Sequence, residues 1–278
     1  MTWSAPDHYD AKARPGMSAR RAIAERAAGP SAAIKRYHND VKRCLIDIFA
    51  TGAPRYLDIA CGRGGDIFKW IGANVRFVRG IDVSPREIAE ARSRFAAVRP
   101  RPRTTDCVFE TVSDAARWSS PDNEAYDVVA CMFAIHYFFG SEDRARSFFA
   151  TVSASLEVGG VFFGVFPDGR RVLEAATTGA GGPSMRIEVD DDDDDDGEFG
   201  REVSFEIPDT VIEGGSREFL VFPETLTRLA AEHGLEPIAE YDTGTLLDPR
   251  DRRKCIRHLA ATRHPVSALY ATFAFIKR

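Results

Sequence analysis

The chain has 278 residues, of which 44% are hydrophobic and 28% are charged, values typical of a soluble globular protein with one large α/β domain or two small ones. No apolar run is long enough to span a membrane and the amino terminus lacks a signal-peptide pattern, so we expect an intracellular protein of the nucleus or cytoplasm. Five cysteines without a Cys-x-x-Cys pair predict reduced thiols, not disulfides or zinc ligands.

The net charge of −5 depends on one segment, an unbroken run of seven aspartates from Asp190 to Asp196. Removing those seven negative charges leaves +2, so the remaining body is mildly basic and could accept an anionic or nucleic-acid substrate. The run repels itself, which predicts a disordered acidic loop within an insertion at about 178–215. Residues 1–30 predict an irregular amino-terminal arm, followed by a single domain over 31–278.

Helices and strands alternate along most of the chain. Ser31 is placed to cap a first helix whose apolar residues recur at helical spacing as far as Phe49. We predict strands at 55–60, 75–81, 107–112, 126–131 and 160–166, and helices at 65–73, 85–96, 114–118, 141–156 and from 168. In the last third of the chain we predict strands at 202–207, 217–222, 236–241 and 268–276 and helices at 223–233 and 250–262. This order predicts an α/β, Rossmann-like fold: a mostly parallel seven-stranded sheet with an antiparallel edge strand and helices on both faces.

A glycine-rich turn follows the first predicted strand, in the segment Tyr-Leu-Asp-Ile-Ala-Cys-Gly-Arg-Gly-Gly-Asp over 56–66. Glycine lets the backbone approach a ligand closely, and the next helix begins with unpaired N–H groups. Asp82 closes the second strand, where a Rossmann-like fold binds ribose hydroxyls. The loop lacks the later third glycine of dinucleotide sites, which favours S-adenosylmethionine over NAD. The alternative is an ordinary tight turn with Asp82 as a strand-end residue.

A second informative segment covers 126–139, where an apolar strand is followed by His136 and Tyr137. Polar groups at the carboxyl end of a strand face the ligand edge of such a sheet. The pattern therefore indicates functional roles for both residues. The alternative is a packing histidine beside a core aromatic.

These segments resemble those of the mRNA cap guanine-N7 methyltransferases of the cellular and large-DNA-virus type. The likeness runs in order along nearly the whole chain, through residues 8–10, 34–42, 57–66, 69–70, 131–137, 164–168, 218–222 and 267–275. Three positions depart from the family, which usually has Gly, Lys and Gln where this chain has Ala60, Arg63 and Met132.

The resemblance implies a class I methyltransferase that binds S-adenosylmethionine, releases S-adenosylhomocysteine and uses no metal. The implied cofactor residues are Lys42 for the methionine carboxylate, Ala60 and Gly62 by backbone approach, Asp82 for the ribose, Ser113 or Asp114 for the adenine, and Met132 and Tyr137 at the border of the cofactor.

The resemblance also implies a cap site, in which Asn39, Arg63, Lys69 and Arg94 would contact the nucleotide or its phosphates, and His136, Glu218 and Tyr270 would frame the guanine. Guanine N7 would attack the methyl carbon in line, without a general base. Implied partners are the capped 5′ end of RNA and a stimulatory subunit or other capping components, with no membrane; a viral protein would work in a cytoplasmic factory.

Two other functions stay open. One is a small-molecule methyltransferase of the same fold, with the insertion as a lid. The other is a non-catalytic cap- or RNA-binding module that kept the fold, in which the acidic loop could serve a partner.

Overall fold

The computed structural model describes residues 32–121, 123–179, 186–189, 197–206, 216–238 and 265–278. The predicted amino-terminal arm, the helix at 250–262 and the acidic run Asp190–Asp196 lie outside these ranges, so they stay predictions. Across the described ranges, no helix combines the length and apolar character needed to cross a bilayer.

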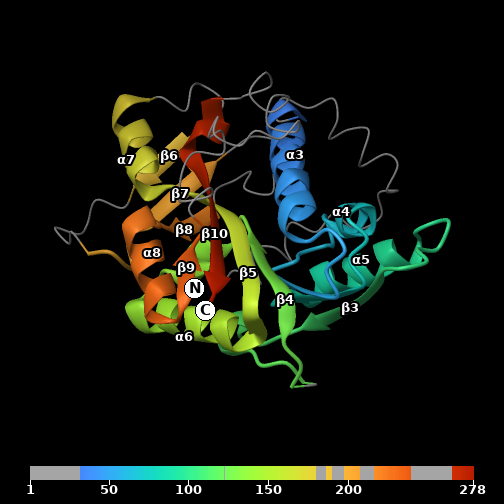
Figure 1. Ribbon diagram of the computed structural model, residues 1–278. Helices are drawn as coiled ribbons and strands as arrows, with labels where there is room; N and C mark the ends of the chain where they lie inside the picture. The colour runs from blue at the N-terminus through green and yellow to red at the C-terminus, as the bar shows by residue number, and fades with distance from the viewer. Residues whose placement is uncertain (1–31, 122, 180–185, 190–196, 207–215, 239–264) are drawn as a thin grey trace.

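The main sheet has seven strands in the order β3-β2-β1-β4-β5-β10-β9 (Figure 1). The strands are β1 (Arg55–Ile59), β2 (Phe77–Asp82), β3 (Asp106–Thr111), β4 (Tyr126–Met132), β5 (Leu156–Pro167), β9 (Leu235–Pro237) and β10 (Tyr270–Lys277). Strands β1 to β5 pair in parallel, whereas β10 runs antiparallel to both of its neighbours, β5 and β9. The predicted fold class is confirmed. The antiparallel strand is not at the edge of the sheet, as predicted, but is the second strand from the edge, next to β9.

The register brings the carboxyl ends of the parallel strands to one edge. Ile59 at the end of β1 pairs with Ile81 in β2 and with Cys131 in β4. The reversed strand β10 begins where β5 ends, with Tyr270 opposite Pro167. Segments that follow β1, β2 and β4 therefore meet the start of β10 at the same edge, which is where α/β folds bind ligands.

Helices cover both faces of the sheet. They are α3 (Ala32–Phe49), α4 (Ile67–Gly72), α5 (Pro85–Ala96), α6 (Glu142–Ser155), α7 (Gly169–Thr178) and α8 (Pro223–Glu232), with 3-10 turns η1 (Ala115–Arg117), η2 (Ile135–Phe138) and η4 (Pro265–Leu269). Alternate strand residues enter opposite cores: Tyr56 packs with residues of α3 and α4, and Leu57 packs with residues of α6 and α8. Figure 1 shows α6 and α8 together, away from α3, α4 and α5.

Local sequence sets the ends of several helices. The Ser84 side chain accepts a hydrogen bond from the Glu87 amide at 3.1 Å, and Pro85 occupies the first turn of α5. The Asp168 carboxylate caps α7 in the same way, and Gly179, with φ of 69°, ends it. Helix α4 is shorter than predicted because a turn over residues 62–66 precedes it.

A separate three-stranded antiparallel sheet carries β6 (Arg186–Val189), β7 (Glu202–Glu206) and β8 (Ser216–Phe219). Strand β6 was not predicted, although its four residues alternate between exposed and half-buried positions. Strand β8 is shorter than the predicted 217–222, because the Leu220 amide donates to Arg201 and Val221 accepts from Gly169. This small sheet positions Ser216 and Glu218.

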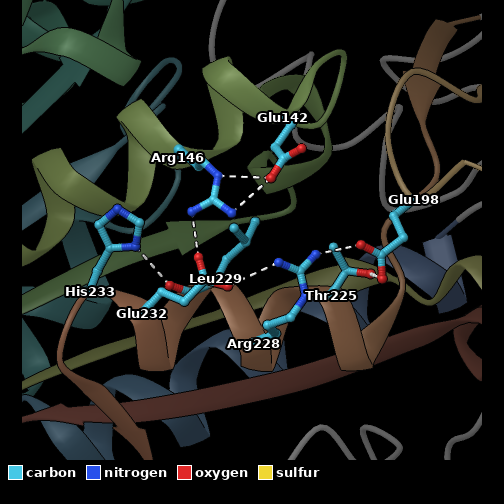
Figure 2. A network of polar contacts seen from close by, with 8 residues as sticks. All are labelled: Glu142, Arg146, Glu198, Thr225, Arg228, Leu229, Glu232 and His233. Atoms are coloured by element: carbon cyan, nitrogen blue, oxygen red, sulfur yellow. Dashed lines mark hydrogen bonds and ion pairs between the residues drawn. The ribbon is translucent and has the colours of Figure 1, made fainter.

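An ion-pair network joins α6, α8 and the segment before β7 (Figure 2). Arg146 pairs with Glu142 and Glu232, and Arg228 pairs with Glu232 and Glu198. These side chains are substantially exposed, so each pair contributes little stability, and the buried apolar residues of α6 and α8 hold the two helices together.

Candidate active site

The loop after β1 uses left-handed backbone at three alternate positions. Ala60, Gly62 and Gly64 have φ of 60°, 51° and 70°. At Gly64 the positive φ disfavours an L-residue, and a Cβ there would also lie 2.6 Å from Ile67 Cδ1 at the start of α4, so glycine is favoured on both counts. Ala60 adopts a conformation that costs an L-residue about 1–2 kcal/mol, and strain of this kind is typical of functional sites.

We expect Ala60→Gly to raise the free energy of unfolding by about 0.5–1 kcal/mol, because glycine removes the strain but adds freedom to the unfolded chain. Denaturant titration measures the change. The matched control is Gly52→Ala, since Gly52 has φ of 74° and open space around its Cβ position; that variant should lose stability through backbone strain alone. An Ala60→Gly protein no more stable than wild type would show that Ala60 carries no net strain.

Asp82 closes this loop from the neighbouring strand. Its carboxylate accepts hydrogen bonds from the Gly62 amide at 2.8 Å and the Ser84 amide at 2.9 Å, and the residue is buried. Burial raises the pKa of Asp82, although the backbone donors act to lower it. Asp82 thus holds the glycine loop against the start of α5.

The predicted adenine residues follow β3, next to Asp82, whose carbonyl accepts from the Val112 amide at 3.0 Å. Ser113 is exposed. The Asp114 carboxylate caps η1 by accepting from the Ala116 amide, and it lies 3.3 Å from Arg144. Both residues thus lie close to the predicted ribose carboxylate, and Asp114 is also engaged in capping.

Two lysines of the predicted site converge on Asp66, a residue that sequence reasoning did not select. Lys42 Nζ and Lys69 Nζ each lie 2.7 Å from its carboxylate oxygens, and Lys69 also donates to Asn39 Oδ1 at 2.9 Å. Burial raises the pKa of Asp66, but the two ammonium groups outweigh it and hold that pKa below its usual range. The cluster therefore fixes Lys42, Asn39 and Lys69 at the mouth of the glycine loop.

Two further predicted cap residues lie along α5 and are ion-paired. Arg63 donates twice to Glu87 in the first turn of α5, from Nε at 2.9 Å and from Nη2 at 2.5 Å. Arg94, in the last turn of α5, donates to Glu90 at 2.7 Å. Both guanidinium groups remain partly exposed.

The end of β4 is also strained. Phe133 has φ of 59°, unusual for a large side chain, and its amide donates to Val165 at 2.9 Å. Its ring lies 4.7 Å from the His38 ring and 5.3 Å from the Tyr270 ring. The predicted Tyr270 therefore belongs to an aromatic cluster with His38 and Phe133, and the predicted Met132 is buried just before it.

His136 and Glu218 face each other in a buried cluster of polar side chains. His136 Nε2 lies 3.3 Å from Glu218 Oε2, and the two residues are 3% and 5% exposed. The orientation does not make a hydrogen bond, and within the described residues neither ring nitrogen of His136 has a hydrogen-bond partner. Burial lowers the pKa of His136 to about 3 and raises the pKa of Glu218 to about 8, so at neutral pH both groups are mainly uncharged.

Two hydroxyl groups extend this cluster. Ser216 Oγ donates to Glu218 Oε1 at 3.1 Å and lies 3.4 Å from the Tyr137 hydroxyl. Unsatisfied buried polar groups are costly and rare, so among the described residues the two unpartnered ring nitrogens of His136 mark this cluster as a candidate site for a polar ligand. His136, Glu218 and Tyr137 are therefore brought together, whereas the described ring contacts of Tyr270 are with the aromatic cluster.

Sequence reasoning missed Asp66, His38, Phe133 and Ser216. Asp66 ends the glycine-rich segment 56–66, and His38 lies within the segment 34–42. Both positions could therefore have been selected from these motifs. Ser216 could not have been selected in this way, because it lies in no recognised sequence motif. In the described part of the chain, no three His, Cys, Asp or Glu side chains gather as a metal site requires.

The strand order, the left-handed glycine loop and Asp82 define a class I methyltransferase fold. Solved structures share it over most of their length. An S-adenosylmethionine-dependent methyltransferase from Clostridium acetobutylicum has a TM-score of 0.56 and 16% identity, covering 92% of this chain and 96% of that chain. The CcbJ methyltransferase from Streptomyces caelestis has a TM-score of 0.55 and 18% identity, covering 98% and 95%. Such low identities show the fold alone.

Within this class, the mRNA (guanine-N(7))-methyltransferase domain family matches residues 5–263, and the chain belongs to that family. The mRNA cap guanine-N(7) methyltransferase of Candida glabrata is 30% identical over 235 residues, which is 78% of this chain and 56% of the relative. Its counterpart in Saccharomyces cerevisiae is 29% identical over 262 residues, or 86% and 60%. The predicted family is confirmed, and the chain spans about half the length of the curated relatives it matches.

Proposed function

We propose that this protein transfers the methyl group of S-adenosylmethionine to N7 of the guanine in the GpppN cap of mRNA. The observation that carries the proposal is the buried pair of His136 and Glu218, in which neither His136 ring nitrogen has a described hydrogen-bond partner, at the sheet edge that also carries the glycine loop. A hydrogen-bonding nucleobase would satisfy both residues, and membership of the family specifies guanine.

The residues around the glycine loop fit S-adenosylmethionine. The left-handed backbone of Ala60 and Gly62 would let the ligand approach closely, Asp82 would accept from ribose hydroxyls, and Ser113 and Asp114, which follow the strand next to Asp82, would contact the adenine. Lys42 keeps 18% of its side chain exposed while paired with Asp66, so it can also meet a carboxylate. Met132 and Tyr137 would border the bound molecule. When bound, S-adenosylmethionine supplies a methyl group already activated by its sulfonium.

The guanine would be held by shape and hydrogen bonding. Glu218 in its carboxylate form would accept from the N1–H and the N2 amine, His136 would offer a neutral imidazole, and Tyr270 would provide an aromatic face. Stacking on an aromatic contributes about 1–3 kcal/mol per base. Asn39, Arg63, Lys69 and Arg94 would contact the nucleotide and its phosphates.

The reaction then needs alignment more than acid–base chemistry. Guanine N7 has an available lone pair, so no residue must remove a proton before attack. Holding two reactants in line can contribute about 7–11 kcal/mol toward the barrier. We therefore assign His136, Tyr137, Glu218 and Tyr270 to positioning; a metal-free mechanism stays a prediction.

The decisive experiment is a methyl-transfer assay with radioactive S-adenosylmethionine on capped RNA, GpppG and GTP, followed by mapping of the methylated position. Label at guanine N7 supports the proposal. Label at any other position refutes it, as does transfer to metabolites other than guanine nucleotides in a parallel screen without RNA. Cap binding without transfer would instead indicate a binding module, and adding candidate subunits of a capping complex would test whether transfer requires a stimulatory partner.

We expect cap affinity to rise about tenfold per pH unit from pH 6 to pH 8 and then to level off. In the free protein, burial raises the pKa of Glu218 to about 8, so below that pH the carboxyl must lose a proton before it can accept from guanine. His136, with its pKa near 3, stays neutral across this range. Calorimetry with GpppG in buffers of different ionisation enthalpy measures the released proton.

The control for this pH dependence is Glu218→Gln, which cannot ionise and should show neither the slope nor the proton release. A wild-type affinity that is flat between pH 6 and pH 8 would contradict a protonated Glu218 in the free site.

A further inference from the structure

Four arginines surround the amino ends of β2 and β3, and we call them the arginine cluster: Arg76, Arg99, Arg101 and Arg103. Strands β2 and β3 are parallel neighbours, and the Asp106 amide donates to the Arg76 carbonyl at 2.8 Å, so Arg76 adjoins the α5–β3 segment. All four side chains belong to exposed residues. Figure 1 shows this segment projecting from the side of the molecule that carries α4 and α5.

The arginine cluster differs from many other surface arginines in its charge balance. For example, the exposed Arg170 and Arg278 and the half-buried Arg146 are each paired with a glutamate. By contrast, residues 91–105 contain five arginines and neither Asp nor Glu. Among the described contacts, no carboxylate pairs with any member of the arginine cluster.

Within the arginine cluster, Arg99 is the one side chain with described hydrogen bonds: its guanidinium donates to the carbonyls of Ala96 and Val98 at the end of α5. No described hydrogen bond or ion pair involves the side chains of Arg76, Arg101 or Arg103. The fold therefore keeps several uncompensated positive charges together, which favours an anionic partner.

The position of the arginine cluster points to the RNA chain itself. Helix α5 starts beside Asp82 at the ligand edge and carries Arg63's partner Glu87 in its first turn and Arg94 in its last. Its 12 residues span about 18 Å, and the arginine cluster begins where it ends. An RNA strand leaving a cap whose phosphates contact Arg63 and Arg94 would reach these arginines within several nucleotides.

We propose that the arginine cluster binds phosphates of the RNA body downstream of the cap, along the flank formed by α5 and the edge strand β3. The proposal rests on the proposed function, because it takes capped RNA as the substrate. It adds a second contact region that a cap dinucleotide cannot reach, so affinity should depend on RNA length and on salt.

The test compares wild type with Arg76→Ala/Arg101→Ala/Arg103→Ala, a triple variant that breaks no described side-chain contact. Fluorescence anisotropy with a 3′-labelled capped 20-mer, without S-adenosylmethionine, gives affinity from 50 to 200 mM salt. Three lost phosphate contacts should flatten the log–log salt slope by about 2 and weaken binding at 50 mM salt about tenfold. Competition with unlabelled GpppG should be unchanged.

The matched control is Arg146→Ala/Arg228→Ala/Arg278→Ala, which removes the same charge from solvent-accessible, glutamate-paired positions away from the arginine cluster. This control should keep the wild-type slope. The proposal would be overturned if the first triple variant bound the 20-mer like wild type, or if it lost equal affinity for the 20-mer and for GpppG. A parallel binding assay with phosphatidylserine vesicles tests a membrane partner, and a loss of affinity seen only with the vesicles would also overturn the proposal. Binding is read without methyl transfer, so a failed transfer assay would refute the proposed function separately.

Discussion

Replacing Glu218 with glutamine is expected to lower kcat/KM for capped RNA about 100-fold. Guanine offers two N–H donors to this position, and a hydrogen bond to a charged acceptor contributes about 1.5–3 kcal/mol. Glutamine keeps the shape but directs its own N–H₂ at one of those donors. Because burial already raises the pKa of Glu218 to about 8, the neutral amide resembles the resting protonated carboxyl, and the variant should fold normally.

Steady-state kinetics on capped RNA, together with calorimetric binding of S-adenosylmethionine, measure this effect. Cofactor affinity should not change, because Glu218 contacts Ser216 and His136 rather than the glycine loop. The matched control is Glu198→Gln, an exposed carboxylate of the network in Figure 2 that lies outside the site, and it should keep wild-type activity. Full activity in Glu218→Gln would remove Glu218 from guanine recognition and with it the main support for the proposed function.

Local patterns in the sequence predicted most of the scaffold, because a parallel sheet imposes its own rules. Buried strands read as apolar runs, helices start at residues such as Ser84 and Asp168, and Asp82 is found by its distance from the glycine loop. Each of these features involves residues close together in the sequence, so it can be recognised from the sequence alone. The prediction failed at β6, a four-residue strand that depends on pairing with β7 more than on its own composition.

The candidate site was predictable only in part, because its geometry depends on long-range packing. His136 and Glu218 are separated by more than eighty residues, and only the family resemblance joined them. The structure shows contacts that residue spacing in the sequence does not reveal. Asp66 forms ion pairs with both Lys42 and Lys69. Phe133 has a left-handed backbone conformation, and its ring contacts those of Tyr270 and His38. Such strained or buried polar positions break local rules, which is why local patterns miss them.

We expect Asp82→Asn to weaken binding of S-adenosylmethionine about 30–100-fold and to leave cap binding intact. Asp82 has two tasks: its carboxylate accepts from the Gly62 and Ser84 amides, and it is the proposed acceptor for ribose hydroxyls. An amide side chain provides one oxygen instead of two and turns an N–H₂ group toward a backbone donor or toward the ribose. Leaving such a buried donor unsatisfied costs about 1–3 kcal/mol, so the free energy of unfolding should also fall by about that amount.

Calorimetry for the cofactor, anisotropy for capped RNA and denaturant titration separate these effects. Asp143→Asn is the matched control, since Asp143 is an exposed residue in the first turn of α6 and the variant should preserve all three values. If Asp82→Asn lost stability but bound S-adenosylmethionine like wild type, Asp82 would only brace the glycine loop. The ribose would then have to be held elsewhere along the carboxyl edge, with the exposed Ser113 as the next candidate to change.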